Sequence, residues 1–197
     1  MILGRLEEFL GKRNLNLRIL DQDHLIDWFS CGRDTLMDAW LSKHAREWQA
    51  ENLCQVWVLT NRNTPGDPIG FFTLSSHQVT PASIPKPHRA QVKSNKSWVN
   101  NLDQAFPATL LGKFALERNS QGQGFGEVLM LCAYTQHLEA ASHSSAKFLV
   151  LDVQNDSLAE YYSKRFGFFR ALNWDGPGRM IKATKTIETE LIGALRH

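Results

Sequence analysis

The chain has 197 residues, of which 43% are apolar and 21% are charged, and 22 Lys and Arg against 20 Asp and Glu give a formal net charge of +2. This composition excludes disordered, collagen-like and low-complexity proteins, and the length favours one domain over residues 1–197. The three cysteines lie far apart, and no run approaches the roughly 18 apolar residues of a membrane span. We therefore expect reduced thiols, no metal site, no membrane segment and a cytoplasmic protein.

The first third of the chain predicts a strand, a helix and a hairpin after a polar N-terminal segment. Within Leu15–Leu20 the first four residues alternate apolar with polar side chains, as a half-buried strand does. Helical spacing of the large side chains predicts a helix over Asp34–Gln49, with Asp34 as its cap. Two apolar runs, Val56–Thr60 and Ile69–Leu74, flank a segment rich in Asn, Pro and Gly and predict a hairpin with a long loop.

Residues 79–107 break this pattern and predict an insertion of loops around a short helix. Four prolines punctuate the segment, and no Asp or Glu occurs from Pro68 to Leu102. The insertion is therefore locally basic, which fits either a solvated loop or a surface that contacts nucleic-acid phosphates. Its cations are Lys86, Arg89, Lys93 and Lys96.

The second half of the chain predicts alternating strands and helices around a glycine-rich loop. In chain order these are a buried strand over Thr109–Leu116, the loop Gln121–Gly126, a helix over Glu127–Ala141, a buried strand over Phe148–Val153, a helix over about Ser157–Arg165 and a strand over Met180–Thr184.

The glycine loop lies between a predicted strand and a predicted helix, where backbone N–H groups can converge on an anion. Gly122, Gly124 and Gly126 leave room for a phosphate, and the following helix adds the positive end of its dipole. The spacing matches neither the dinucleotide-binding nor the P-loop fingerprint. A tight turn without a ligand is the alternative interpretation.

Neighbouring residues favour the ligand-binding interpretation through a resemblance. Gln121-x-x-Gly124-x-Gly126 resembles the Q/R-x-x-G-x-G/A pyrophosphate loop of the GNAT superfamily of N-acetyltransferases. The downstream segment from Asn155 to Gly167 is similar to the family's N-x-x-A-x-x-L-Y-x-x-x-G-F pattern, with one extra residue between the tyrosine position and Gly167. The resemblance implies an α/β (α+β) GNAT fold, in which helices flank a central, mixed and twisted sheet.

A narrower resemblance covers most of the chain. Phe29-Ser-Cys-Gly32 and Leu110-Leu-Gly-Lys-Phe-Ala-Leu-Glu-Arg118 look like the F-x-C-G and L-L-G-R-L-A-V-D-R motifs of toxin acetyltransferases from type II toxin–antitoxin pairs. Lys113 replaces the arginine of the second motif and Glu117 replaces its aspartate. The resemblance implies acetyl transfer from acetyl-CoA to the α-amino group of aminoacyl-tRNA, which blocks translation, and it implies a small DNA-binding antitoxin and a homodimer as partners.

The resemblance also assigns roles to individual residues. Tyr162 is the general acid, with Tyr161 as its competitor because of the extra residue before Gly167. The cofactor-binding residues are Phe114, Ala115, Leu116, Gln121, Gly122, Gln123, Gly124, Phe125, Gly126 and Asn155. Positive charge, and not the resemblance, marks the candidate tRNA-binding residues, which are Lys86, Arg89, Lys93, Lys96, Lys113 and Arg118.

Two other functions remain open on the sequence alone. The chain could be a GNAT enzyme that acetylates a small amine, a peptide or a protein lysine, or a degenerate GNAT fold that only binds a partner. The basic insertion favours tRNA over the small amine, and the intact loop with Tyr162 argues against a degenerate fold.

Overall fold

The computed structural model describes residues 2–32, 34–91, 104–174, 176 and 178–195, and its centre is one seven-stranded sheet in the order β1-β2-β3-β4-β5-β7-β6. Strands β4 and β5 pair in parallel, and the other neighbouring strands pair antiparallel. The predicted mixed sheet flanked by helices is therefore confirmed. The strands are β1 (Leu15–Ile19), β2 (Gln55–Asn61), β3 (Thr64–Val79), β4 (Phe106–Leu116), β5 (Phe148–Asp152), β6 (Phe169–Arg170) and β7 (Arg179–Ala183).

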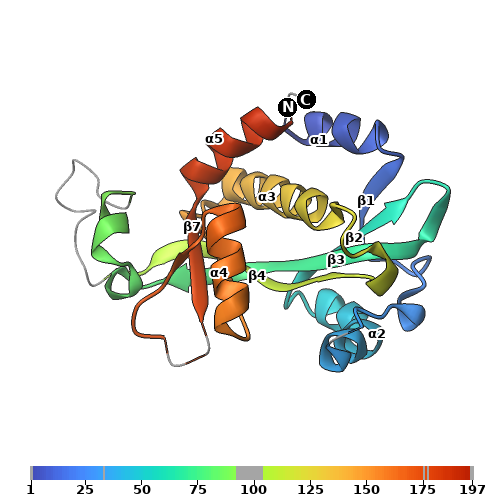
Figure 1. Cartoon of the computed structure of the whole chain (residues 1–197), viewed down its shortest axis with the longest axis horizontal. Coiled ribbons are helices and arrows are strands. Elements are labelled where there is room, and N and C mark those ends of the chain that lie inside the picture. The colour runs from blue at the N-terminus through green and yellow to red at the C-terminus, as the bar shows by residue number, and fades with distance from the viewer. Residues whose placement is uncertain (1, 33, 92–103, 175, 177, 196–197) are drawn as a thin grey trace.

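Helices cover both faces of the sheet. Figure 1 shows α1, α3 and α5 stacked on one side and α2 on the other, with the two chain ends close together. The first side, which α4 joins, shares one apolar core with alternate sheet residues such as Phe72 and Leu149, whereas α2 packs on Phe71 and Val58 from the opposite face. The helices are α1 (Ile2–Gly11), α2 (Thr35–Ala50), α3 (Phe125–Ser144), α4 (Asp156–Phe166) and α5 (Thr184–Ala194).

Two helices correct the sequence prediction. The N-terminal segment is not merely polar: it forms α1, whose Leu6, Phe9 and Leu10 are buried against the core. Helix α5 follows β7 directly and buries Ile187 and Leu191. Strand β3 is also longer than the expected run, because its polar second half pairs with β4 as far as Val79 and Phe106.

The insertion follows the end of β3 and precedes the start of β4. Its described part contains two short 3₁₀ turns, η2 (Pro81–Ser83) and η3 (Lys86–Gln91), and His88 stacks on Phe169 with ring centroids 4.1 Å apart. Lys93 and Lys96 lie outside the described residues.

Candidate active site

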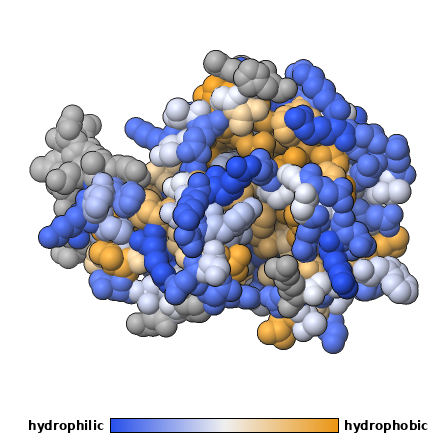
Figure 2. Space-filling view, viewed as in Figure 1, coloured by the Kyte–Doolittle hydropathy of each residue, from blue (hydrophilic) through white to orange (hydrophobic). Residues whose placement is uncertain are grey.

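A cleft opens where β4 and β5 part. The two strands pair only from Ala108 to Leu111 on β4 and from Phe148 to Leu151 on β5, whereas β4 continues to Leu116. A cavity of about 690 Å³ lies beyond the last pair, a volume typical of small-molecule and cofactor sites. Figure 2 shows apolar residues in a recess between two hydrophilic flanks. Residues from five segments line the cavity: Cys31, Asp34, Met37, Leu111, Gly112, Phe114, Ala115, Leu116, Gln121, Gly126, Leu151, Asp152, Val153, Gln154, Asn155, Ser157, Leu158, Tyr161 and Tyr162.

A β-bulge shapes the β4 wall of this cleft. Phe72 pairs with Phe114 but Leu74 pairs with Leu111, so β4 carries one extra residue opposite Thr73. The Lys113 N–H donates to the Thr73 hydroxyl at 2.9 Å instead of to a strand carbonyl. Bulges of this kind bend a strand and redirect its groups, and here the bulge lies where β4 leaves its partner β5.

The glycine loop lies at the start of α3. Gly122 and Gly124 have φ values of 75° and 83°, in the left-handed region that other residues rarely adopt, and nothing lies within 4 Å of the space that a Cβ would fill. The N–H of Glu127 makes the first hydrogen bond of α3, to the Gly124 carbonyl, so the N–H groups just before it lie at the positive helix end. The loop therefore suits an anion.

Two glutamine side chains hold the loop in this shape. Gln121 donates from its amide to the carbonyls of Cys31 at 2.8 Å and Leu116 at 3.2 Å, and Gln123 donates to the Asn119 carbonyl at 2.6 Å. Their amide donors thus fix the loop to its surroundings, which leaves the backbone to face a ligand. Glu117 caps the turn η5 (Arg118–Ser120) by accepting from the Asn119 N–H.

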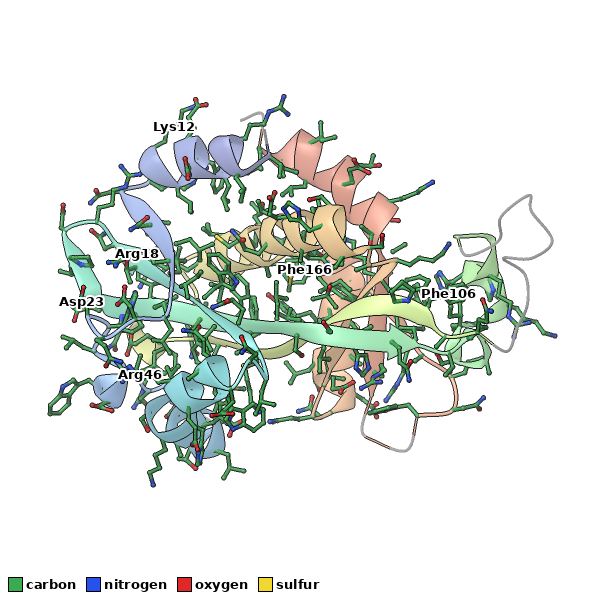
Figure 3. All side chains as sticks on the ribbon, turned by 180° about the vertical axis from the view of Figure 1, so that it is seen from behind. Lys12, Arg18, Asp23, Arg46, Phe106 and Phe166 are labelled. Carbon is green, nitrogen blue, oxygen red and sulfur yellow. The ribbon has the colours of Figure 1, made fainter. Side chains whose placement is uncertain are left out.

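Helix α4 brings both candidate tyrosines to the cavity. Tyr161 is 48% exposed, whereas the Tyr162 ring packs on Phe166 and Phe168 with centroid distances of 5.9 and 6.1 Å. Phe166, labelled below α3 in Figure 3, is half-buried and packs against the core. Burial, reinforced by the nearby Tyr161, raises the pKa of the Tyr162 phenol well above its usual value, so Tyr162 keeps its proton at neutral pH.

Asn155 fixes the position of this helix. Its side-chain oxygen caps α4 by accepting from the Leu158 N–H at 2.9 Å, and Asn155 also lines the cavity. At the other end, Gly167 adopts a left-handed conformation with φ of 67° and terminates the helix. The two motif positions thus define the helix that carries Tyr162.

The predicted cations fall into two groups at opposite ends of β4. The Lys113 ammonium lies 5.5 Å from the Trp40 ring centroid, and the Arg118 side chain packs on Gly32. Lys86 is exposed, and Arg89 donates to the Ile84 carbonyl at 3.3 Å. The insertion lies at the far end of the strand, marked by Phe106 in Figure 3. The spacing from Phe106 to Lys113 is about 23 Å at the usual strand rise.

Asp34 and Gln154 also line the cavity, although no sequence motif marks them as cavity residues. The Gln154 amide donates to the Asp34 carboxylate at 2.8 Å across 120 positions of sequence. Asp152, which also lines the cavity, pairs with Arg179 through two hydrogen bonds of 2.8 Å. No local pattern signals either contact, because the partners meet only in the folded chain.

Among the residues that the structure describes, no group of three His, Cys, Asp or Glu side chains could hold a metal ion. No helix in this described part is long and apolar enough to cross a membrane.

A mixed sheet split between two parallel strands, with a glycine loop at the start of the next helix, defines the GNAT class of fold. No family model matches the chain. The tRNA-acetylating toxin of Mycobacterium tuberculosis is 28% identical to it over 145 residues, which cover 74% of this chain and 78% of the relative.

Solved structures agree with this fold. One similar structure is a tyrosine-to-phenylalanine variant of the toxin AtaT, bound to the C-terminus of the antitoxin AtaR and to acetyl-CoA. It is 21% identical to this chain, and the match covers 90% of this chain and 98% of the AtaT chain, with a TM-score of 0.71. AtaT complexed with acetyl-methionyl-tRNAfMet is 22% identical to this chain, and the match covers 89% of this chain and 98% of the AtaT chain, with a TM-score of 0.74. The predicted GNAT fold and the predicted resemblance to toxin acetyltransferases are confirmed.

Proposed function

We propose that the protein is an acetyl-CoA-dependent N-acetyltransferase that acetylates the α-amino group of aminoacyl-tRNA and so blocks translation. The observation that carries this proposal is the cleft between β4 and β5, which combines a glycine loop, an exposed strand edge and a protonated Tyr162. The similarity to a tRNA-acetylating toxin supports the same acceptor.

The donor half of the site is formed by the loop and β4. The loop Gln121–Gly126 offers backbone N–H groups to the diphosphate of acetyl-CoA at the N-terminus of α3. The β4 segment Phe114–Leu116 lies beyond the last β4–β5 pair, so its backbone groups on that edge, apart from the Leu116 carbonyl that accepts from Gln121, are available to the pantetheine arm. Asn155, which caps α4, also lines the cavity and is proposed to contact acetyl-CoA there.

The chemistry needs one acid and no strong base. The neutral amine attacks the thioester carbonyl carbon, a C–N bond forms, and the C–S bond breaks. The nitrogen releases one proton to water, and the departing thiolate takes the proton of Tyr162, which solvent later restores. An α-amino group has a pKa of about 7.7 to 8.0, and in an aminoacyl ester it is lower still, so much of the acceptor is already nucleophilic at neutral pH.

The acceptor half is basic at both ends of β4. Lys113 and Arg118 lie near the cleft, and Lys86 and Arg89 lie on the insertion, a separation that an RNA stem can bridge. Lys93 and Lys96 are proposed to extend the second group. Because AtaT is bound by an antitoxin in a solved structure, we infer a small antitoxin as partner, and we retain the cytoplasmic location, the homodimer and the single domain as proposals.

An acetyl-transfer assay with a panel of charged tRNAs tests the acceptor. The purified protein should transfer label from acetyl-CoA to aminoacyl-tRNA but not to deacylated tRNA, whose 3′ end offers no amine. Label on polyamines, peptides or protein lysines, with none on any charged tRNA, would overturn the tRNA proposal and leave a general N-acetyltransferase.

A further inference from the structure

Asp34 is the carboxylate of the cavity that lacks a cationic partner at contact distance within the described chain. Asp34 and Asp152 both line the cavity. Each oxygen of Asp152 accepts from the Arg179 guanidinium at 2.8 Å, which offsets the negative charge of Asp152. The contacts of Asp34 are instead uncharged dipoles, namely two backbone N–H groups and the Gln154 amide. A negative charge therefore faces the cavity at Asp34.

The contacts of Asp34 leave one acceptor position open. Its Oδ1 atom accepts from the N–H groups of Leu36 at 3.0 Å and Met37 at 3.1 Å and so caps α2. Its Oδ2 atom accepts from Gln154 at 2.8 Å. A carboxylate has about four lone-pair positions, so these three hydrogen bonds leave one, and it is on Oδ2. The cap needs only Oδ1.

Asp34 also begins the helix on the opposite face of the sheet from α3, beside a segment that the glycine loop contacts through Gln121 and Cys31. The glycine loop leads into α3, which packs on one face of the sheet, whereas Asp34 begins α2, which packs on the other. Donor and acceptor must meet at the gap between β4 and β5, the point where the two faces communicate. A group that binds the acceptor amine belongs on the α2 side, where Asp34 lies.

We propose that Oδ2 of Asp34 accepts a hydrogen bond from the acceptor amino group and holds its lone pair toward the thioester. This inference rests on the proposed acetyltransferase function. As the amine attacks, positive charge develops on its nitrogen, and a fixed carboxylate stabilises that charge more than it stabilises the neutral amine.

Asp34 is a binding group and not a base. The pKa of Asp34 is lowered, first of all by the hydrogen bond from Gln154, whereas burial acts in the opposite direction. The N–H groups of Met37 and Leu36 and the positive charge of Lys113 lower the pKa further. A carboxylate with a lowered pKa stays ionised at neutral pH but takes up protons poorly. The proton of the amine therefore leaves to water, as in the reaction above.

The variant Asp34→Asn separates charge from structure. Asparagine caps a helix as well as aspartate does, and its amide can keep the contact with Gln154 if that amide turns over. The matched control is Asp38→Asn. Asp38 lies in the first turn of the same helix, but its oxygens accept from the Ser30 hydroxyl and the Cys31 N–H. Both variants thus remove one negative charge from one helix terminus.

We expect Asp34→Asn to lower kcat/KM for the amine acceptor by about 10- to 100-fold, the range for a lost hydrogen bond to a charged group. The thermal shift by acetyl-CoA and the acceptor-free hydrolysis of acetyl-CoA should stay unchanged, and Asp38→Asn should act like the wild type. An Asp34→Asn enzyme within twofold of the wild type, or an equal loss in Asp38→Asn, would overturn the inference.

The same experiment distinguishes this inference from the tRNA proposal. Rates are compared on whichever amine the wild type acetylates, whether aminoacyl-tRNA, a polyamine or a peptide. If the wild type acetylates only polyamines or peptides and Asp34→Asn still impairs that reaction, the tRNA proposal fails and the role of Asp34 stands. If the wild type acetylates no amine at all, the acetyltransferase assignment fails and the role of Asp34 fails with it.

Discussion

Replacing Tyr162 by phenylalanine should remove the proton donor while leaving the helix intact. The ring packs on Phe166 and Phe168, and the substitution keeps those contacts. The lost hydroxyl is the group proposed to protonate the thiolate, and general acid catalysis contributes about 10² to 10⁴ in rate. We expect kcat to fall by roughly 10²-fold or more, which corresponds to about 2.7 kcal/mol of activation free energy.

The pH profile adds a second constraint on Tyr162. Because burial raises the pKa of this phenol, it remains protonated above neutral pH, and activity should not decline from its ionisation in the usual assay range. The rate should instead rise with pH through the pKa of the acceptor amine. Loss of activity near pH 8 in the wild type that is absent in Tyr162→Phe would contradict this account.

The paired control is Tyr161→Phe, since both tyrosines line the cavity and Tyr161 is 48% exposed. Steady-state kinetics with acetyl-CoA and the amine acceptor should show little change for Tyr161→Phe. Acetyl-CoA affinity should remain near normal in both variants. A larger kcat loss in Tyr161→Phe than in Tyr162→Phe would refute the assignment of the acid to Tyr162.

Three further outcomes follow from the structure. Gly124→Val forces a branched side chain into a left-handed backbone at the anion loop and should abolish the acetyl-CoA thermal shift, whereas Gly193→Ala on an open helix surface should not. Burial lowers the pKa of His137 to about 4, so below pH 6.5 the unfolded chain binds a proton at this residue more readily than the folded protein does. The free energy of unfolding is therefore highest above pH 6.5 and decreases as the pH drops toward 4. This loss is about 3 kcal/mol, and urea titrations should show it for the wild type but not for His137→Gln. Removing Lys86 and Arg89 together should reduce the salt slope of tRNA binding by roughly one unit per lost phosphate contact, and an unchanged slope would exclude these contacts.

The core strands and the glycine loop were predictable from sequence because their signals are local. Apolar runs mark β4 and β5, and Asp34 marks the start of α2, which it caps as predicted. Helix α5 was missed because it begins straight after β7, and Ala183 at its N-cap makes no side-chain hydrogen bond. Helix α1 is not indicated in the sequence analysis although a local signal exists, because Leu6, Phe9 and Leu10 recur at the i, i+3, i+4 spacing of an amphipathic helix.

The cleft itself could be predicted only through a family resemblance. The motif residues of the loop and α4 carry a recognisable spacing, which marks Gln121, Asn155 and Tyr162, all of which line the cavity, as candidates from the sequence alone. The hydrogen bond between Asp34 and Gln154 joins residues 120 positions apart, and no spacing rule reaches that far. The bulge opposite Thr73 depends on how β3 and β4 pair, and the alternation of apolar and polar residues within one strand does not define that pairing.

The most direct measurement is the identification of the acetylated product. Charged tRNAs incubated with the protein and acetyl-CoA are digested with a nuclease, and the released 3′-terminal aminoacyl-adenosine is analysed by mass spectrometry. The account predicts that the mass of one acetyl group appears on the α-amino nitrogen of the aminoacyl group with the wild type and is strongly reduced with Tyr162→Phe. An unmodified aminoacyl-adenosine from every charged tRNA, with the wild type active on another amine, would contradict it.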